Sequence, residues 1–287
     1  MIRLSLLRHS RKTEGAPHRQ SLASSMLVWR RGFAPFALLT GVFAFAGALP
    51  SKAAGNDNAR VPVLLELFTS EGCSSCPPAD RLLQVFDQSQ PVANANLIVL
   101  SEHVDYWDRL GWKDPFSSPQ FTARQQDYAD RYSREGAYTP QLVVDGRFAL
   151  VGNDSREANA AIQKAAREPK VAIALSDVAR DGKQVKARIA VPASAELKKR
   201  SAVLYVVLAD NRAESQVSRG ENAGRSLAHV AVTRVLKEAG AMDLVNGSSK
   251  EILLTVPAGA GANGLRLVAF LQDSSSGHVL GVAAQKL

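Results

Sequence analysis

Cysteine and histidine are scarce in this sequence. Its 287 residues include two cysteines and five histidines. So few cysteines exclude a small scaffold held together by several disulfides. A structural zinc site usually takes four ligands, often two cysteine pairs, and no second pair is present. The sequence also has no internal repeat, no phosphate-binding glycine loop and no nucleophile-elbow pattern.

Acidic residues are almost absent from the first 53 positions, which hold eight Lys or Arg and one Glu. This segment carries nearly all of the formal net charge of +8, so the rest of the chain is close to neutral. A surface for nucleic acid or anionic lipid would concentrate basic residues in the folded part of the chain. The charge pattern therefore argues against both partners.

The same 53 residues have the three parts of a secretory signal. Arg30 and Arg31 precede the apolar stretch 32–49, and Ser51 and Ala53 are the small residues before a cleavage point. The alternative is a membrane anchor, because the apolar stretch approaches the length of a bilayer span. Its Gly, Pro and Ala residues favour cleavage. We expect a periplasmic or secreted protein with no stable membrane span.

Both cysteines lie in the stretch ELFTSEGCSSCPPAD, as Cys73 and Cys76. In an exported protein such a pair can persist as a disulfide, whereas in the cytosol it would favour metal or a reduced dithiol. The apolar run 61–68 before it predicts a strand buried on both faces. The prolines that follow suit the first turn of a helix. The pair is thus expected where a buried strand passes into a helix.

The elements that follow continue in a definite order. A second strand (97–100) is followed by a helix that begins at Ser118-Pro119. Next, Thr139-Pro140 precedes a strand, an Asp145-Gly146 turn and a strand, and then a helix capped near Asp154. This is the element order of the thioredoxin fold, in which a proline before the hairpin lies opposite the cysteines. We predict a thioredoxin-like α/β domain over residues 58–169, with a mixed sheet flanked by helices.

Beyond Pro169 the pattern changes to short β-rich runs separated by DG, NG and GA turns. Seven such runs predict an all-β, sandwich-like domain over residues 170–287. The run that begins at Ala228 also fits a helix, and both interpretations stay open.

The chain resembles a family of exported bacterial thioredoxin-like proteins, the domain of unknown function numbered 1223. The stretches that carry the resemblance are ELFTSEGCSSCPPAD, HVDYWDRLGWKDPFSSPQFTARQ, YTPQLVVDG and GENAGRSLAHVAVTR. The resemblance implies the fold and export, and little about a reaction.

The wider thioredoxin superfamily implies a role for each residue of the site. Cys73 would be the nucleophile, Cys76 the resolving thiol and Pro140, after Thr139, the cis proline. One position departs from that pattern: six residues before the first cysteine, where thioredoxins have a buried acid, this chain has Leu67. Glu66 is one position away, and a one-residue shift along a strand reverses the face. A relay role for Glu66 would need a bulge in the strand.

The chemistry expected of the pair is disulfide exchange, which requires a thiolate. A free cysteine has a pKa of about 8.5, and a position at a helix start lowers that pKa. Cys73 is therefore expected to attack and Cys76 to resolve. The alternative is a structural disulfide, but a two-residue loop removes little entropy from the unfolded chain.

Copper(I) is the other chemistry considered for the pair, with His103 as a third ligand. A lone histidine is more often a hydrogen-bonded structural residue, so we predict no metal and no cofactor.

Two further loops are candidate parts of the site. Aromatic residues between 103 and 116 would form a lid or peptide-binding wall, or pack the interface between the two domains; these are Tyr106, Trp107, Trp112 and Phe116. Glu221 and His229 in the second half would form a hydrolytic pair, or a contact with the first half or with a partner.

The sequence thus predicts an exported protein that exchanges disulfides with a protein or a small-molecule thiol. The competing interpretation is a non-enzymatic interaction or copper-handling module that uses the same cysteines.

Overall fold

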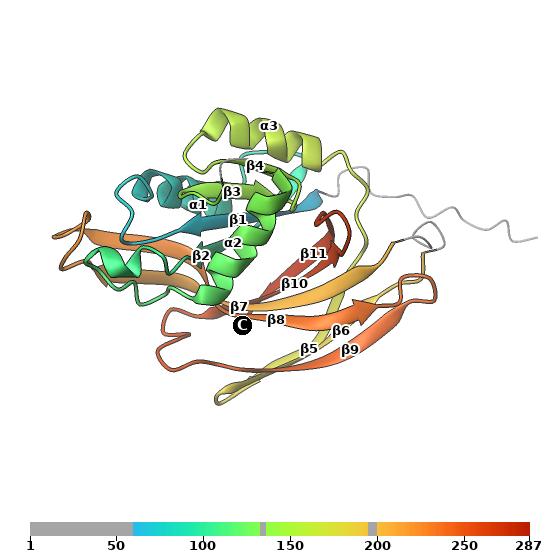
Figure 1. Cartoon of the computed structure of the whole chain (residues 1–287). Coiled ribbons are helices and arrows are strands. Elements are labelled where there is room, and N and C mark those ends of the chain that lie inside the picture. The colour runs from blue at the N-terminus through green and yellow to red at the C-terminus, as the bar shows by residue number, and fades with distance from the viewer. Residues whose placement is uncertain (1–59, 133–135, 195–199) are drawn as a thin grey trace, which may run out of the picture. The chain divides into compact units, whose positions relative to one another are not determined.

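The computed structural model describes residues 60–287, apart from 133–135 and 195–199 (Figure 1). The predicted signal segment, residues 1–53, lies outside these described residues. Within them, no helix combines the length and apolar character that a membrane span requires.

The first half of the described chain forms four neighbouring strands of a mixed sheet, with helices on both faces. In chain order the elements are β1 (Val61–Thr69), α1 (Pro77–Ser89), β2 (Ala95–His103), the 3-10 helix η1 (Asp108–Leu110), α2 (Pro119–Tyr132), β3 (Gln141–Val144), β4 (Phe148–Val151) and α3 (Ser155–Ala165). The strands are ordered β2-β1-β3-β4, and only β1 and β2 are parallel. The strands and helices predicted here are confirmed.

The two faces of this sheet bury different residues of β1. Because side chains alternate along a strand, Leu65 and Leu67 point to the face covered by α1 and α3. Leu64 points to the opposite face and packs with Phe121 of α2. In Figure 1, α3 lies over β3 and β4 while α2 crosses β1 and β2. Side chains of consecutive residues on β1 therefore contact different helices.

The described residues of the second half form strands joined by turns and loops, with no helix after α3. Its elements are β5 (Ala174–Asp181), β6 (Gln184–Val191), β7 (Ala202–Gln216), β8 (Ser226–Met242), β9 (Ser248–Thr255), β10 (Leu265–Asp273) and β11 (Val279–Lys286). Each of the seven predicted β-rich runs contributes to one of these strands. The run at Ala228, which also fitted a helix, is the strand β8.

Strands β5, β6 and β9 form a separate sheet of three strands, in the order β5-β6-β9. Its buried residues Ile189 and Leu254 belong to one apolar cluster with Leu204 of β7 and Leu267 of β10. Two sheets thus face each other across a shared core, as in a sandwich.

The larger sheet crosses the expected domain boundary at residues 169 and 170. Its order is β11-β10-β7-β8-β2-β1-β3-β4, so strands from both halves lie in one sheet of eight. The junction is a parallel contact between β2 and β8, with Ser101 opposite Val232. The two halves therefore share a sheet, and β7 and β8 extend to the same end of the molecule as the cysteine loop.

A buried ionic network occupies the α2 face of the sheet. Arg124 Nε donates to Glu66 Oε1 at 2.6 Å, and the Tyr128 hydroxyl donates to Glu66 Oε2 at 2.7 Å. Glu102 Oε2 lies 3.8 Å from Arg124 Nε, and neither of its carboxylate oxygens has a hydrogen-bond partner. The Arg124 guanidinium thus lies beside two buried carboxyl groups. Burial, followed by the nearby Glu66, raises the pKa of Glu102 to about 8.

This network predicts a pH-dependent stability that Glu102→Gln removes. A carboxyl whose pKa is raised in the fold stabilises it at low pH, and this contribution is lost as pH rises from about 4.5 through about 8. We expect the unfolding free energy of the wild type to fall more steeply over this range, leaving Glu102→Gln more stable near pH 9 by roughly 1–3 kcal/mol. Urea denaturation at pH 5 and pH 9 measures this difference.

Glu251→Gln is the matched control. It also removes a carboxylate that is paired with an arginine, but both Glu251 and its partner Arg188 are exposed, so the pair should contribute little to stability. Wild type and Glu102→Gln with parallel pH profiles would contradict the prediction.

Candidate functional site around the cysteine pair

Cys73 and Cys76 form a disulfide just beyond the carboxyl end of β1, with Cα atoms 5.4 Å apart. The Cys73 N–H donates to the Ser70 carbonyl, and the Cys76 N–H to the Cys73 carbonyl, each at 3.2 Å. Cys76 is the N-cap residue of α1, and prolines open the helix. Both cysteines are 0% exposed, whereas Ser74 and Ser75 between them are exposed. The serines, and not the sulfur atoms, face outward.

Thr139 and Pro140 are joined by a cis peptide bond. The next residue, Gln141, pairs with Phe68 of β1, so this peptide lies beside the end of β1 that leads to the cysteines. Trp107 Nε1 donates to Thr139 Oγ1 at 2.8 Å, and a methyl group added at Gly72 would meet Trp107 Cβ at 3.1 Å. Trp107 thus links Thr139 to the loop that holds Cys73.

The remaining aromatic residues of this loop also contact the protein interior. Trp112 Nε1 donates to Glu71 Oε2 at 2.8 Å. The Tyr106 hydroxyl donates to Gln125 Oε1 at 3.2 Å. The Phe116 ring packs edge-on against His103, with centroids 5.4 Å apart. These contacts favour internal packing over a peptide-binding wall.

The turn between β7 and β8, residues 217–225, covers the cysteine loop; we call it the hairpin tip. Asn222 is 0% exposed, and its Nδ2 donates to the carbonyls of Glu71 and Cys73, each at 2.9 Å. Glu221 Oε2 accepts a hydrogen bond from the Ser74 N–H at 3.0 Å, and its hydrogen bonds with Ser74 lower the pKa of Glu221. The second half of the chain therefore contacts the cysteine loop directly.

A buried charged cluster lies beneath the cysteine loop. His229 Nε2 is 3.5 Å from Glu71 Oε1, and His229 Nδ1 is 3.6 Å from Asp80 Oδ1. Ser215 Oγ also donates to Glu71 Oε1, and Thr69 Oγ1 donates to Asp80 Oδ1 at 3.0 Å. Burial lowers the pKa of His229, but Asp80 and then Glu71 outweigh it and raise that pKa to about 10. A charged imidazole thus sits between two acids that flank the cysteines in sequence.

His103 extends this cluster away from the cysteines. Its Nδ1 lies 2.7 Å from Asp114 Oδ2, which also accepts the Glu71 N–H at 2.8 Å. Burial raises the pKa of Asp114, but the charge of His103 and these hydrogen bonds hold it below its ordinary value. The His103 and His229 rings meet edge to face, 4.7 Å apart. Within the described part of the chain, no three Cys, His, Asp or Glu residues are grouped so that they could hold a metal ion.

Several expectations about individual residues can now be placed. Glu66 faces α2, because β1 runs in unbroken register from Val61 to Thr69 and has no bulge. Glu221 is exposed and binds Ser74, whereas His229 is buried between Glu71 and Asp80, so the considered hydrolytic pair is divided between two environments. The loop that holds Glu221 was also expected to contact the first half of the chain, and the hairpin tip makes this contact.

Sequence reasoning missed Glu71 and Asp80, and it did not place Asn222 beside Cys73. Asp80 follows Cys76 by four residues, a helical spacing that places both on one face of α1 and gives a local signal. Glu71 stands two residues before Cys73 without any such periodicity. Asn222 is 149 residues from Cys73 in sequence, and only the pairing of β8 with β2 brings it near.

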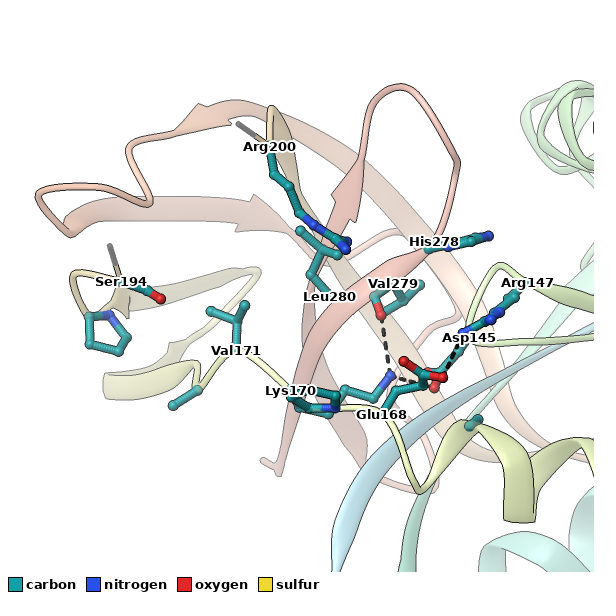
Figure 2. Close-up of a pocket in the computed structure, with 14 residues that line it drawn as sticks. Asp145, Arg147, Glu168, Lys170, Val171, Ser194, Arg200, His278, Val279 and Leu280 are labelled. Carbon is teal, nitrogen blue, oxygen red and sulfur yellow. Dashed lines mark hydrogen bonds and ion pairs between the residues drawn. The ribbon is translucent and has the colours of Figure 1, made fainter. Parts of the chain in front are cut away.

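A cavity of about 540 Å³ lies away from the cysteines, between the β3–β4 turn, the segment that follows α3 and the start of β11 (Figure 2). In its lining, Lys170 Nζ lies 2.5 Å from Asp145 Oδ2, and Arg147 Nη1 lies 3.0 Å from Glu168 Oε1. Its lining contains no cysteine, and these charges are already paired. This cavity therefore offers no thiol for disulfide exchange.

Replacing His229 by Gln tests the charged cluster. A histidine whose pKa is raised in the fold contributes stability that is fully present below about 6.5 and is lost as pH rises through about 10. We expect His229→Gln to be less stable than wild type by about 3 kcal/mol at pH 6, because two buried acids lose their cation. The difference should shrink towards pH 10 in urea denaturation.

His278→Gln, which changes a partly exposed histidine outside the cluster, is the control. A His229→Gln difference that stays constant with pH would show that the variant merely loses packing.

Two solved structures resemble the chain. A protein from Agrobacterium tumefaciens is 26% identical, with a TM-score of 0.58 over 79% of this chain and 94% of that one. HBP35 of Porphyromonas gingivalis is 14% identical, with a TM-score of 0.60 over 80% of this chain and 76% of that one, a likeness of fold alone. No curated protein matches the chain. The family model described as a protein of unknown function (DUF1223) matches residues 64–272, which span both cysteines, the charged cluster and the hairpin tip, and the chain belongs to this family.

Proposed function

We propose that this chain is an exported, thioredoxin-like protein whose Cys73–Cys76 pair exchanges disulfides. The observation that carries the proposal is the position of the pair, between the end of β1 and the start of α1 in a sheet ordered β2-β1-β3-β4. The peptide Thr139-Pro140, at the start of β3, lies beside the same end of β1. Strand, cysteine pair, helix and cis proline occur here in the combination that thioredoxin-like proteins use.

Exchange would proceed by two sulfur attacks in sequence. The Cys73 thiolate attacks one sulfur of a substrate disulfide and releases the first substrate thiolate. Cys76 then loses its proton and attacks Cys73 Sγ, which releases the second thiolate and leaves the Cys73–Cys76 disulfide. Two electrons pass to the substrate, and the two protons of the pair end on its thiols. The reverse sequence oxidises a substrate dithiol.

Support for export comes from the basic and apolar parts of residues 30–53, together with a pair that is oxidised in the structure. Disulfides persist in the periplasm and outside the cell. A location in one of these compartments is consistent with both features.

A non-enzymatic module is the second candidate, and the complete burial of both sulfur atoms favours it. In that case the pair would mark a binding surface. The first step of exchange separates the candidates, because it requires Cys73 alone as nucleophile.

The test uses the chain without its first 53 residues, reduced with excess dithiothreitol and then freed of it. We expect the wild type to release thiol from a small peptide disulfide, Cys76→Ser to stop at a mixed disulfide visible by mass spectrometry, and Cys73→Ser to fall to background. An unchanged rate in Cys73→Ser would overturn the proposal. A reduced wild type that releases no thiol above background would support the second candidate.

A further inference from the structure

The hairpin tip occupies backbone groups on both sides of Cys73. The Asn222 side chain donates to the carbonyls of Glu71 and Cys73, and the Glu221 carboxylate accepts a hydrogen bond from the Ser74 N–H. An extended peptide laid across the cysteines would pair with such groups, since peptides commonly bind by main-chain hydrogen bonds. While the tip is in place, these three backbone groups are not available to a polypeptide substrate.

The tip is also braced internally. The Val217 N–H donates to the Arg225 carbonyl, and the Gly224 N–H returns to the Val217 carbonyl, at 2.9 and 2.8 Å. Gly220 also packs against Gly111, in the loop of residues 103–116 that holds the aromatic side chains. A methyl group added at Gly111 would meet Gly220 Cα at 3.4 Å. These contacts hold the tip as one unit, so admitting a polypeptide requires displacing all of it.

The outer edge where these two loops meet is basic. Arg219 adjoins Gly220, and Arg109 and Lys113 lie two residues to either side of Gly111. All three side chains are exposed, and we call them the rim. Two acids lie nearby: Glu221 accepts the Ser74 N–H, and Asp108 accepts the Ser117 hydroxyl at 2.8 Å. Both keep their negative charge, but the three cations of the rim outnumber them. The rim therefore gives this edge a net positive charge, which attracts an anion.

We propose that the cysteine pair acts on small, negatively charged thiols and disulfides, and that Asn222 determines this specificity by holding the tip against larger substrates. This proposal rests on the disulfide exchange proposed above and names its substrate class. A small disulfide needs only a limited opening beside Ser74 and Ser75, whereas a protein disulfide carries chain on both sides of its sulfur atoms. The rim adds selection by charge.

The size limit is tested with the reduced protein and two probes, oxidised glutathione and the disulfides of insulin. We expect the wild type to reduce oxidised glutathione much faster than insulin. Asn222→Ala should raise the insulin rate about tenfold or more, the effect of losing two hydrogen bonds, and change the glutathione rate far less. Glu221→Ala, which removes the hydrogen bond to the Ser74 N–H at an exposed position, should act in the same direction. Asn263→Ala removes a similar amide contact elsewhere and should change neither rate.

The charge preference is tested with two small disulfides of opposite charge, oxidised glutathione and cystamine. We expect the wild type to prefer glutathione at low salt, and the triple variant Arg109→Gln, Lys113→Gln, Arg219→Gln to lose that preference. The control, Arg180→Gln, Lys183→Gln, Lys186→Gln, removes the same charge from exposed positions of β5, β6 and their turn, and should keep it.

Insulin and glutathione rates that respond equally to Asn222→Ala, or a wild type that favours cystamine, would overturn this proposal while leaving disulfide exchange intact. A reduced protein that neither small disulfide oxidises would instead contradict the proposed exchange itself.

Discussion

Pairing between β2 and β8 is the interaction on which the rest of the structure depends. The two strands share the single parallel register position Ser101–Val232, a short ladder for joining two halves of a chain. Helices on both faces reinforce it: Gln84 of α1 donates to the Ala228 carbonyl at 2.6 Å, and Gln120 of α2 to the Leu236 carbonyl at 2.8 Å. Because the junction holds β8 in place, His229 and the hairpin tip reach the cysteine loop.

The alternation of side chains along β1 and β2 then separates two buried ionic groups. Glu66 and Glu102 point to the α2 face, where Arg124 lies between them. His103 follows Glu102 by one residue, points the other way and joins the cluster of Glu71, Asp80 and His229. The buried acids closest to the cysteines in sequence thus come from the loop after β1 and from α1, and Leu67 of β1 belongs to the apolar core. The sheet keeps the two sets of charges apart.

Local patterns were sufficient to predict the elements of this fold. The apolar run of β1, the prolines of α1, the Asp145-Gly146 turn and the Asp154 cap each act within a few residues, and each is present. The same patterns indicated two domains, because no local signal reports that Ser101 and Val232 lie opposite each other. Asn222 and His229 could not be assigned to the site for the same reason: their contacts span about half of the chain.

Most contacts that hold the cysteine loop do not involve sulfur. Asn222 binds two of its carbonyls, Asp114 binds the Glu71 N–H, and Trp112 binds the Glu71 carboxylate. The disulfide itself closes a two-residue loop and therefore restricts the unfolded chain little. None of these hydrogen bonds uses a sulfur atom, so reduction of the disulfide removes none of them directly. A pair that alternates between disulfide and dithiol needs that independence, whereas a structural cross-link does not.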